Sequence, residues 1–440
     1  MPLAAGRPSL FQPGWIVFAL FTLNPVWWLM GFGGFTWSLA FIPLWGWILL
    51  RRDVRWLPTL NLFVIYIGWA LLTIIRLDRA TRYLSFSFRY TAYLTALGLA
   101  LYVFNERRVT RATFIRWVSW LWVAAVIGGY LGILFPNTTI RTTIASTVLP
   151  GSLTSNDFVG NLVRPGFAQV QTFLGFAVPR PKTLFPFTNE WGGNVGLLTP
   201  FFIASFVYSS VKRERSFGMV MLLVAVPPMI LSLNRGLWLS LALTFGVMAY
   251  RSFLQGRTAP LKVLIAGVVV VGILVIATPL RQVVESRLSE SDAETREGLY
   301  QEAWEGAKRS PILGYGGPRP SINPFSPSIG THGHVWLVMF SHGFVGLGLY
   351  LAWIVGAIRA AIRPRDQVSL LLACVVIVGG AQMFFYNLLP ISIPIVMTAF
   401  GLLCRPADDD PVLRPQLAPL AASTRPSAQA SAGSGVSSRA

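Results

Sequence analysis

Apolar residues form long runs along most of this chain, and short polar connections separate them. Each run approaches the roughly 20 residues that cross the hydrocarbon core of a bilayer as a helix. The pattern predicts an all-α, polytopic bundle of transmembrane helices with about twelve spans. The predicted spans are Trp15–Met30, Phe35–Leu50, Leu57–Ile75, Tyr90–Phe104, Phe114–Phe135, Trp191–Val211, Phe217–Leu233, Leu237–Tyr250, Leu261–Thr278, His334–Ile358, Val368–Phe385 and Leu388–Leu403.

The composition supports a membrane protein, because 54% of the residues are hydrophobic and only 12% are charged. In soluble domains about a quarter of the residues are usually charged. The first run lacks a clear small-residue cleavage site and is interpreted as a transmembrane helix rather than a signal peptide. Cys374 and Cys404 lie in or beside apolar runs, and they indicate no disulfide framework.

Basic residues gather in alternate short connections, after the second, fourth, sixth, eighth and tenth runs. They are Arg51, Arg52, Arg55, Arg107, Arg108, Arg111, Arg116, Lys212, Arg213, Arg215, Arg251, Arg257, Lys262, Arg359, Arg363 and Arg365. The positive-inside rule places these connections, and both termini, in the cytoplasm. This pattern also explains the net charge of +19, so we expect membrane lipids rather than nucleic acid as partners.

The same alternation leaves two long loops outside, at about 136–190 and 280–333. Loops of this length usually carry function. We therefore expect residues 1–404 to form a catalytic bundle with its chemistry at the outer face. Residues 405–440, rich in Ala, Ser and Pro, are expected to be a disordered cytoplasmic tail, in which Asp408–Asp410 are solvated.

Within the second loop, Glu294–Arg309 predicts an amphipathic helix. The apolar side holds Leu299, Tyr300, Ala303, Trp304 and Ala307, while Gln301, Glu305, Lys308 and Arg309 lie opposite. Arg296 falls on the apolar side, where a guanidinium needs a partner. The partner is a phosphate in the functional interpretation, and a carboxylate or lipid headgroup in the structural one.

Arg235 is a second informative cation, because it lies in a very short outer connection that the positive-inside rule disfavours. It is either a functional residue or an interfacial side chain. Further candidate substrate contacts are Arg180, Lys182, Asn189 and Glu190 of the first loop and Tyr300 of the second. A shared anionic ligand or anionic headgroups would each explain the basic members.

All three histidines, His332, His334 and His342, occur at the start of the tenth run, and one of them is a candidate general base. Their spacings fit no usual zinc pattern, and no Cys lies nearby. We therefore expect no metal. For His342 an ordinary hydrogen-bonded side chain is the preferred interpretation.

Three stretches together resemble the O-antigen ligase and polymerase family of bacterial envelopes. The first is Asn234-Arg235-Gly236. The second is the amphipathic helix from Arg296 followed by Pro311-Ile312-Leu313-Gly314-Tyr315-Gly316. The third is Thr331-His332-Gly333-His334 with Gly343-Phe344-Val345-Gly346 after it. The likeness covers roughly residues 234–351.

This resemblance implies a fold similar to lipid-dependent glycosyltransferases of the GT-C type. It also implies transfer of a glycan from undecaprenyl diphosphate to an acceptor hydroxyl of a glycan or glycolipid, outside the bacterial inner membrane. No nucleotide, metal or other cofactor is then required. Arg235 and Arg296 match the arginines of the family, and His332 matches its histidine. Gly333 stands where the family often has Asn, so the choice between His332 and His334 as the base stays open.

Two alternatives accompany this interpretation. A polymerase would join repeat units on the lipid carrier, and the sequence does not separate it from a ligase. A transporter belongs to a different class, and we see no inverted repeat or matching pair of broken spans that would favour it.

Overall fold

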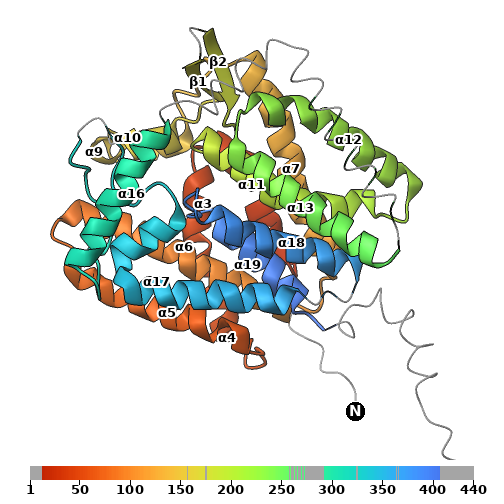
Figure 1. Cartoon of the computed structure of the whole chain (residues 1–440), viewed down its shortest axis with the longest axis horizontal. Helices are drawn as coiled ribbons and strands as arrows, with labels where there is room; N and C mark the ends of the chain where they lie inside the picture. The colour runs from red at the N-terminus through yellow and green to blue at the C-terminus, as the bar shows by residue number, and fades with distance from the viewer. Residues whose placement is uncertain are drawn as a thin grey trace, which may run out of the picture. The chain divides into compact units, whose positions relative to one another are not determined.

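The structure is a computed structural model and describes residues 12–155, 157–173, 176–256, 292–323, 326–362 and 366–406, with single positions at 258, 262, 265, 269, 272 and 364. It is mostly helical, as Figure 1 shows. Its contacts divide the chain into Met1–Cys404 and Arg405–Ala440. The predicted tail lies almost entirely outside the described residues, and so does most of the run predicted at Leu261–Thr278.

The first half of the chain forms α1 (Trp15–Val17), a π-helical turn (Phe18–Thr22), α2 (Asn24–Leu29), α3 (Gly33–Leu39), α4 (Phe41–Leu50), a 3-10 turn (Pro58–Leu60), α5 (Asn61–Leu72), a 3-10 turn (Thr73–Arg76), α6 (Ala80–Asn105), α7 (Arg111–Leu134), α8 (Ile144–Val148), α9 (Gly151–Thr154), α10 (Asp157–Val163), β1 (Ala168–Phe173) and β2 (Phe176–Pro181). The second half forms α11 (Thr188–Phe202), a π-helical turn (Ile203–Val207), α12 (Lys212–Leu231), α13 (Arg235–Leu254), α16 (Asp292–Arg309), α17 (His334–Ala361), α18 (Gln367–Gln382) and α19 (Ser392–Leu403).

Six stretches of the described chain are long and apolar enough to cross a membrane: Gly33–Leu50, Pro58–Arg76, Arg111–Leu134, Lys212–Leu231, Arg235–Leu254 and His334–Ala361. The shorter α18 and α19 are also apolar. The predicted first span is broken into α1, a π-helical turn and α2, because Pro25 begins a new helix. A multi-pass helical membrane protein is therefore supported, whereas the count of twelve and the GT-C-like arrangement stay predictions.

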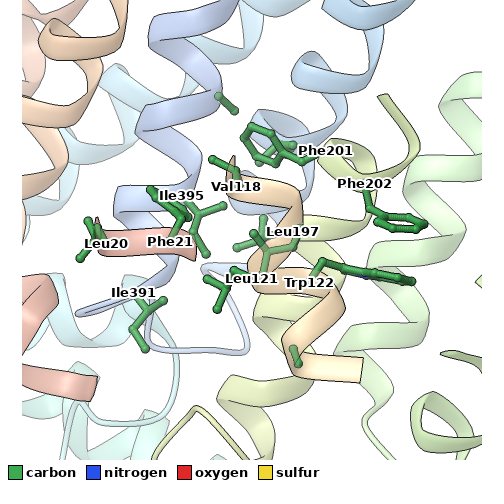
Figure 2. Packing of buried hydrophobic residues seen from close by; sticks show 14 of the residues in the cluster. Leu20, Phe21, Val118, Leu121, Trp122, Leu197, Phe201, Phe202, Ile391 and Ile395 are labelled. Atoms are coloured by element: carbon green, nitrogen blue, oxygen red, sulfur yellow. The ribbon is translucent and has the colours of Figure 1, made fainter. Parts of the chain in front are cut away.

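Close aromatic and small-residue contacts join the central helices. Figure 2 shows Trp122 of α7 beside Phe202 of α11, with ring centroids 3.9 Å apart. On the other side of the bundle, a Cβ added to Gly401 of α19 would lie 2.4 Å from the Ala100 carbonyl oxygen of α6, so a glycine is needed there. Lipid provides no hydrophobic drive between helices, and such close packing is what holds them together.

A two-stranded hairpin corrects the prediction of a purely helical chain. β1 and β2 pair antiparallel, with Gln169 opposite Arg180. The alternation of polar and apolar residues in Ala168–Phe173 is a strand signal, which the prediction of an outer loop passed over. The hairpin packs against α7 and α12, at the upper edge of Figure 1, and thereby brings Arg180 to the bundle.

The loop after α16 is inserted into a break in α17. Gly343 has φ 70° and ψ −176° inside the helix, which interrupts its hydrogen bonds. The freed groups pair with the loop: Phe344 N donates to the Pro311 carbonyl (2.7 Å), and Gly316 N donates to the Ser341 carbonyl (2.8 Å). A Cβ added to Gly314 would lie 2.6 Å from the Phe340 carbonyl oxygen, so this loop also requires a glycine.

Ion pairs connect the basic loops that the sequence places in the cytoplasm. Arg108 Nη2 lies 2.7 Å from Glu106 Oε2, Arg111 Nη2 lies 2.9 Å from Asp366 Oδ2, and Arg116 Nη2 lies 2.8 Å from Glu214 Oε2. Burial would raise the pKa of Glu106, but its hydrogen bonds with Arg108 hold it below the ordinary value. The first pair lies within the loop after α6. The second joins the start of α7 to the start of α18, and the third joins α7 to the start of α12.

We expect Gly343→Ala to destabilise the protein by about 1–3 kcal/mol or more, because an L-residue resists this backbone conformation. The added Cβ would also lie 2.2 Å from the Ile312 carbonyl oxygen. Thermal unfolding in detergent, followed by tryptophan fluorescence, measures the loss. Gly348→Ala in the same helix is the control, since its Cβ would meet nothing within 4 Å. Equal melting temperatures for the two variants would contradict the prediction.

Candidate active site at the starts of α13 and α17

The turn between α12 and α13 is held in place by the side chain of Asn234. Its Oδ1 accepts a hydrogen bond from Leu237 N (3.0 Å), which caps the first turn of α13. Its Nδ2 donates to the carbonyls of Thr188 and Asn189, each at 3.3 Å, at the start of α11. Arg235 is the first residue of α13 and is partly exposed. A guanidinium at a helix N-terminus adds to the positive end of the helix dipole, which favours an anion.

Tyr386 joins this turn to the start of α17. Its hydroxyl accepts from Gly236 N (3.0 Å) and donates to Asn234 Oδ1. Its backbone carbonyl accepts from His334 N at 2.8 Å. One residue therefore brings together Asn234-Arg235-Gly236 and Thr331-His332-Gly333-His334, which are about a hundred residues apart in sequence. The sequence analysis missed Tyr386, although its place between two short apolar runs was a usable signal.

His334 is fully buried, and both of its ring nitrogens are engaged. The Tyr93 hydroxyl lies 3.2 Å from Nε2, and Asn387 Oδ1 lies 3.2 Å from Nδ1. The Tyr66 hydroxyl donates in turn to Tyr93 at 2.9 Å. The consistent pattern is a chain of donors that runs from Tyr66 through Tyr93 and His334 to Asn387. His342 is also buried and pairs through Nδ1 with Thr73 Oγ1 at 2.9 Å.

His332 has a different environment, because it is partly exposed. Its Nδ1 lies 3.1 Å from Thr331 Oγ1, and the Thr331 hydroxyl donates to the Ser328 carbonyl at 2.6 Å. Because the Thr331 hydroxyl proton is donated to the Ser328 carbonyl, Thr331 Oγ1 accepts the hydrogen bond from His332 Nδ1. The resulting tautomer carries its lone pair on Nε2, which is the form a general base requires.

The predicted amphipathic helix is confirmed as α16, and its apolar side packs on α17. Ala303 and Ala307 are fully buried, and the Tyr300 ring stacks on Trp336 with centroids 4.4 Å apart. Tyr300 therefore lies beside the helix turn that follows His332. The side chain of Arg296 lies outside the described part of the structure, so its place in the site stays a prediction.

Arg180 lies behind the α12–α13 turn and is 1% exposed. Its Nε donates to the Ser232 carbonyl at 2.7 Å, and its Nη2 donates to Asn189 Oδ1 at 3.4 Å. A third hydrogen bond goes to Gln171 Oε1. These three acceptors are neutral oxygens, and the contacts support the backbone around Arg235 and the start of α11.

Lys182 and Glu190 are two further predicted substrate contacts. Lys182 packs against Gly166, whose added Cβ would lie 3.1 Å from the lysine Cε. Burial lowers the pKa of the Lys182 amine. Glu190 is partly exposed in the first turn of α11, and its backbone carbonyl accepts from Asn194 Nδ2 at 2.9 Å. Asn189 is the member of the first loop that contacts both Arg180 and Asn234.

Tyr386 joins the two turns that carry Arg235 and His332, and these two residue types suit recognition of an anion beside a proton acceptor. Arg235 supplies a cation at a helix N-terminus, and His332 supplies an imidazole of suitable tautomer. Within the described residues, no group of three His, Cys, Asp or Glu side chains could hold a metal ion. The fold defines a multi-pass helical membrane protein, and the Arg235 turn is its candidate site for an anion.

Comparison with known proteins finds a family model that matches part of the chain. Residues 217–351 match the family model described as O-antigen ligase. The match spans α12, the Arg235 turn, α16, the inserted loop, both candidate histidines and the break in α17. A comparison with curated proteins found no match. The chain therefore carries an O-antigen ligase domain, which confirms the resemblance to the O-antigen ligase and polymerase family and its glycan-handling chemistry at a membrane.

We expect Tyr386→Phe to lower glycan transfer roughly tenfold, because it removes a hydroxyl that pairs with both Asn234 and Gly236. Transfer from a lipid-linked glycan by the purified protein is the measurement. Tyr130→Phe is the control, since its hydroxyl also donates to a carbonyl, that of Val224, on the outside of the bundle. Unchanged transfer by Tyr386→Phe would show that the hydroxyl does not position the turn.

Proposed function

We propose that this chain is a membrane glycosyltransferase of ligase type. It moves a glycan from undecaprenyl diphosphate to an acceptor hydroxyl of a glycan or glycolipid, at the outer face of the bacterial inner membrane. The observation that supports this most is the link through Tyr386 between the turns of Arg235 and His332. These are the two places where the family resemblance assigns function.

The proposed chemistry is a direct displacement at the anomeric carbon. The acceptor oxygen forms the new glycosidic bond while the bond from that carbon to the diphosphate oxygen breaks, and the bonding pair leaves on the diphosphate. Arg235 and Arg296 stabilise the charge that develops there, as preorganised cations do in sites that exclude water. The acceptor proton passes to His332 Nε2. The reaction inverts the configuration and needs no nucleotide.

The environments of the two histidines favour His332 as the base. His334 receives a hydrogen bond at Nε2 from Tyr93, and its two nitrogens are committed to a buried chain of partners. His332 is partly exposed, and Thr331 fixes the tautomer that leaves Nε2 as an acceptor. His334 then serves to position the start of α17 against Asn387 and Tyr386.

The proposed orientation draws on the loop contacts. Arg111 pairs with Asp366 and Arg116 pairs with Glu214, so ion pairs join three of the basic connections, in agreement with one shared cytoplasmic side. The connections at the opposite ends of the helices meet one another instead, where Arg319 Nη1 lies 2.6 Å from Asp78 Oδ1. The candidate site belongs with this second group, so we assign it to the outer face and both termini to the cytoplasm.

The polymerase alternative keeps the same donor chemistry and changes the acceptor to a second lipid-linked repeat unit. Mass spectrometry of the product in nanodiscs separates the two, because a polymerase yields longer chains that remain on the lipid carrier. A transporter would move the glycan across vesicles without forming a new glycosidic bond.

We expect Arg235→Ala and Arg296→Ala each to lower transfer roughly 10²–10³-fold, as removal of a group that stabilises developing charge does. Single-turnover transfer from a lipid-diphosphate glycan measures the effect. Arg251→Ala at the opposite end of α13 and Arg309→Ala at the end of α16 are matched controls with little expected effect. Full activity of Arg296→Ala would end its assignment to the diphosphate.

We expect His332→Ala to lower the rate roughly 10²–10⁴-fold, the range for loss of a general base. Thr331→Val should give a smaller loss and shift the pH profile of the rate, because it releases the imidazole tautomer. The pH dependence of single-turnover transfer tests both. If His332→Ala loses less than tenfold while His334→Ala is severe, the base is His334.

A further inference from the structure

A pocket with both polar and apolar lining residues lies along α17, and no residue of the Arg235 turn lines it. Its lining includes Arg89 and Tyr93 of α6, Gly316 of the inserted loop, and Ser341 and His342 of α17. The space is about 270 Å³, including its opening to solvent. Tyr93 forms a wall of this pocket and also contacts His334 through its hydroxyl, so the pocket adjoins the candidate active site without containing it.

Arg89 gives the pocket a positive charge without a carboxylate. Its Nη1 donates to Ser85 Oγ at 2.8 Å, and it forms no ion pair with the residues that the structure describes. A Cβ added to Gly317 would lie 2.6 Å from Arg89 Nη2, so the glycine leaves room for the guanidinium. A partly buried guanidinium whose charge no carboxylate balances favours an anionic ligand.

Ser341 adds a second donor. Its side chain is 1% exposed, and its Oγ has no hydrogen-bond partner among the described residues. A buried hydroxyl without a partner is costly unless a ligand supplies one. The neighbouring His342 ring is held by Thr73 Oγ1 at 2.9 Å, which fixes this side of the pocket.

More cations lie on the segments that lead to the pocket. Arg76 Nε donates to the Gly314 carbonyl at 3.4 Å, and Arg319 pairs with Asp78 at 2.6 Å, so both hold the inserted loop over α5 and α6. A hydrogen bond from Arg82 lowers the pKa of Asp78, which keeps this carboxylate charged and shared between two arginines. Cations thus outnumber carboxylates here, and such a field raises the local concentration of anions.

We propose that the pocket of Arg89, Ser341 and His342 binds a phosphate group. Arg89 and Ser341 donate to its oxygens, and Gly316 and Gly317 allow the loop backbone to come close. The group belongs either to a free phosphate ion or to the headgroup of an anionic lipid.

Two arms of one experiment distinguish these sources, with the full-length protein. In the first, calorimetry measures binding of inorganic phosphate to protein in phosphatidylcholine nanodiscs. In the second, native mass spectrometry counts the lipids that remain bound after extraction from vesicles of equal phosphatidylglycerol and phosphatidylcholine. Binding in the first arm assigns free phosphate, and selective retention of phosphatidylglycerol in the second assigns a lipid headgroup. Neither arm contains a glycan donor, so the outcome does not depend on the proposed transfer reaction.

We expect Arg89→Gln to weaken binding of phosphate or phosphatidylglycerol, whichever binds, roughly tenfold or more. Ser341→Ala should weaken the same binding by a few fold. Arg79→Gln, at the N-cap of the same helix, is the control, because it removes a nearby charge outside the lining. Melting temperatures close to that of the unchanged protein show that the variants fold. If Arg89→Gln does not fold, the double variant Arg89→Lys, Ser341→Ala takes its place. The proposal is overturned if neither ligand binds, or if Arg79→Gln and Arg89→Gln weaken binding equally.

Discussion

The candidate site depends on one short connection, in which the side chain and the backbone of Tyr386 serve different partners. The phenol fixes the first turn of α13, and the carbonyl fixes the first residue of α17. The two helix starts carry Arg235 and, just before α17, His332. Catalysis by preorganised groups requires their mutual position to be set before the substrate arrives. A residue outside the matched domain of residues 217–351 thus completes the geometry inside it.

The same region shows how irregular backbone is tolerated within a helical membrane protein. Unpaired backbone groups are costly in hydrocarbon, so a broken helix must find partners within the protein. The break at Gly343 is paired by the loop at Pro311–Gly316, and Val335 N donates to the Met383 carbonyl at 3.0 Å. The motif residues Pro311, Gly314 and Gly343 are therefore explained by local packing.

Hydrophobic periodicity was sufficient to predict α16 and the side that it buries, because Ala303 and Ala307 lie on one face whatever the partner. Charge pattern was sufficient to single out Arg235. The place of Tyr386 between two apolar runs marked it as a connection, but its contacts with Asn234 and Gly236 join segments far apart in the chain and could not be predicted from these signals. The hairpin was missed for a related reason: a short alternating segment gains its strand character from pairing, which is not local information. Arg180 was chosen as a substrate contact from its charge, but its hydrogen bonds to Ser232, Asn189 and Gln171 give it a supporting place behind the turn.

The distribution of carboxylates explains why the two ends of the bundle differ in chemistry. At the end assigned to the cytoplasm, Arg108, Arg111 and Arg116 each meet a carboxylate within 3 Å, so their charges are balanced by the protein itself. Near the candidate site, Arg82 and Arg319 share Asp78, whereas Arg89 donates to a serine hydroxyl and pairs with no carboxylate of the described residues. Desolvating a guanidinium without a counter-charge reduces stability, and that cost is recovered when an anionic ligand binds. A carboxylate beside Arg89 would compete with the proposed phosphate group for its guanidinium, so the proposed pocket gains from having none among the described residues.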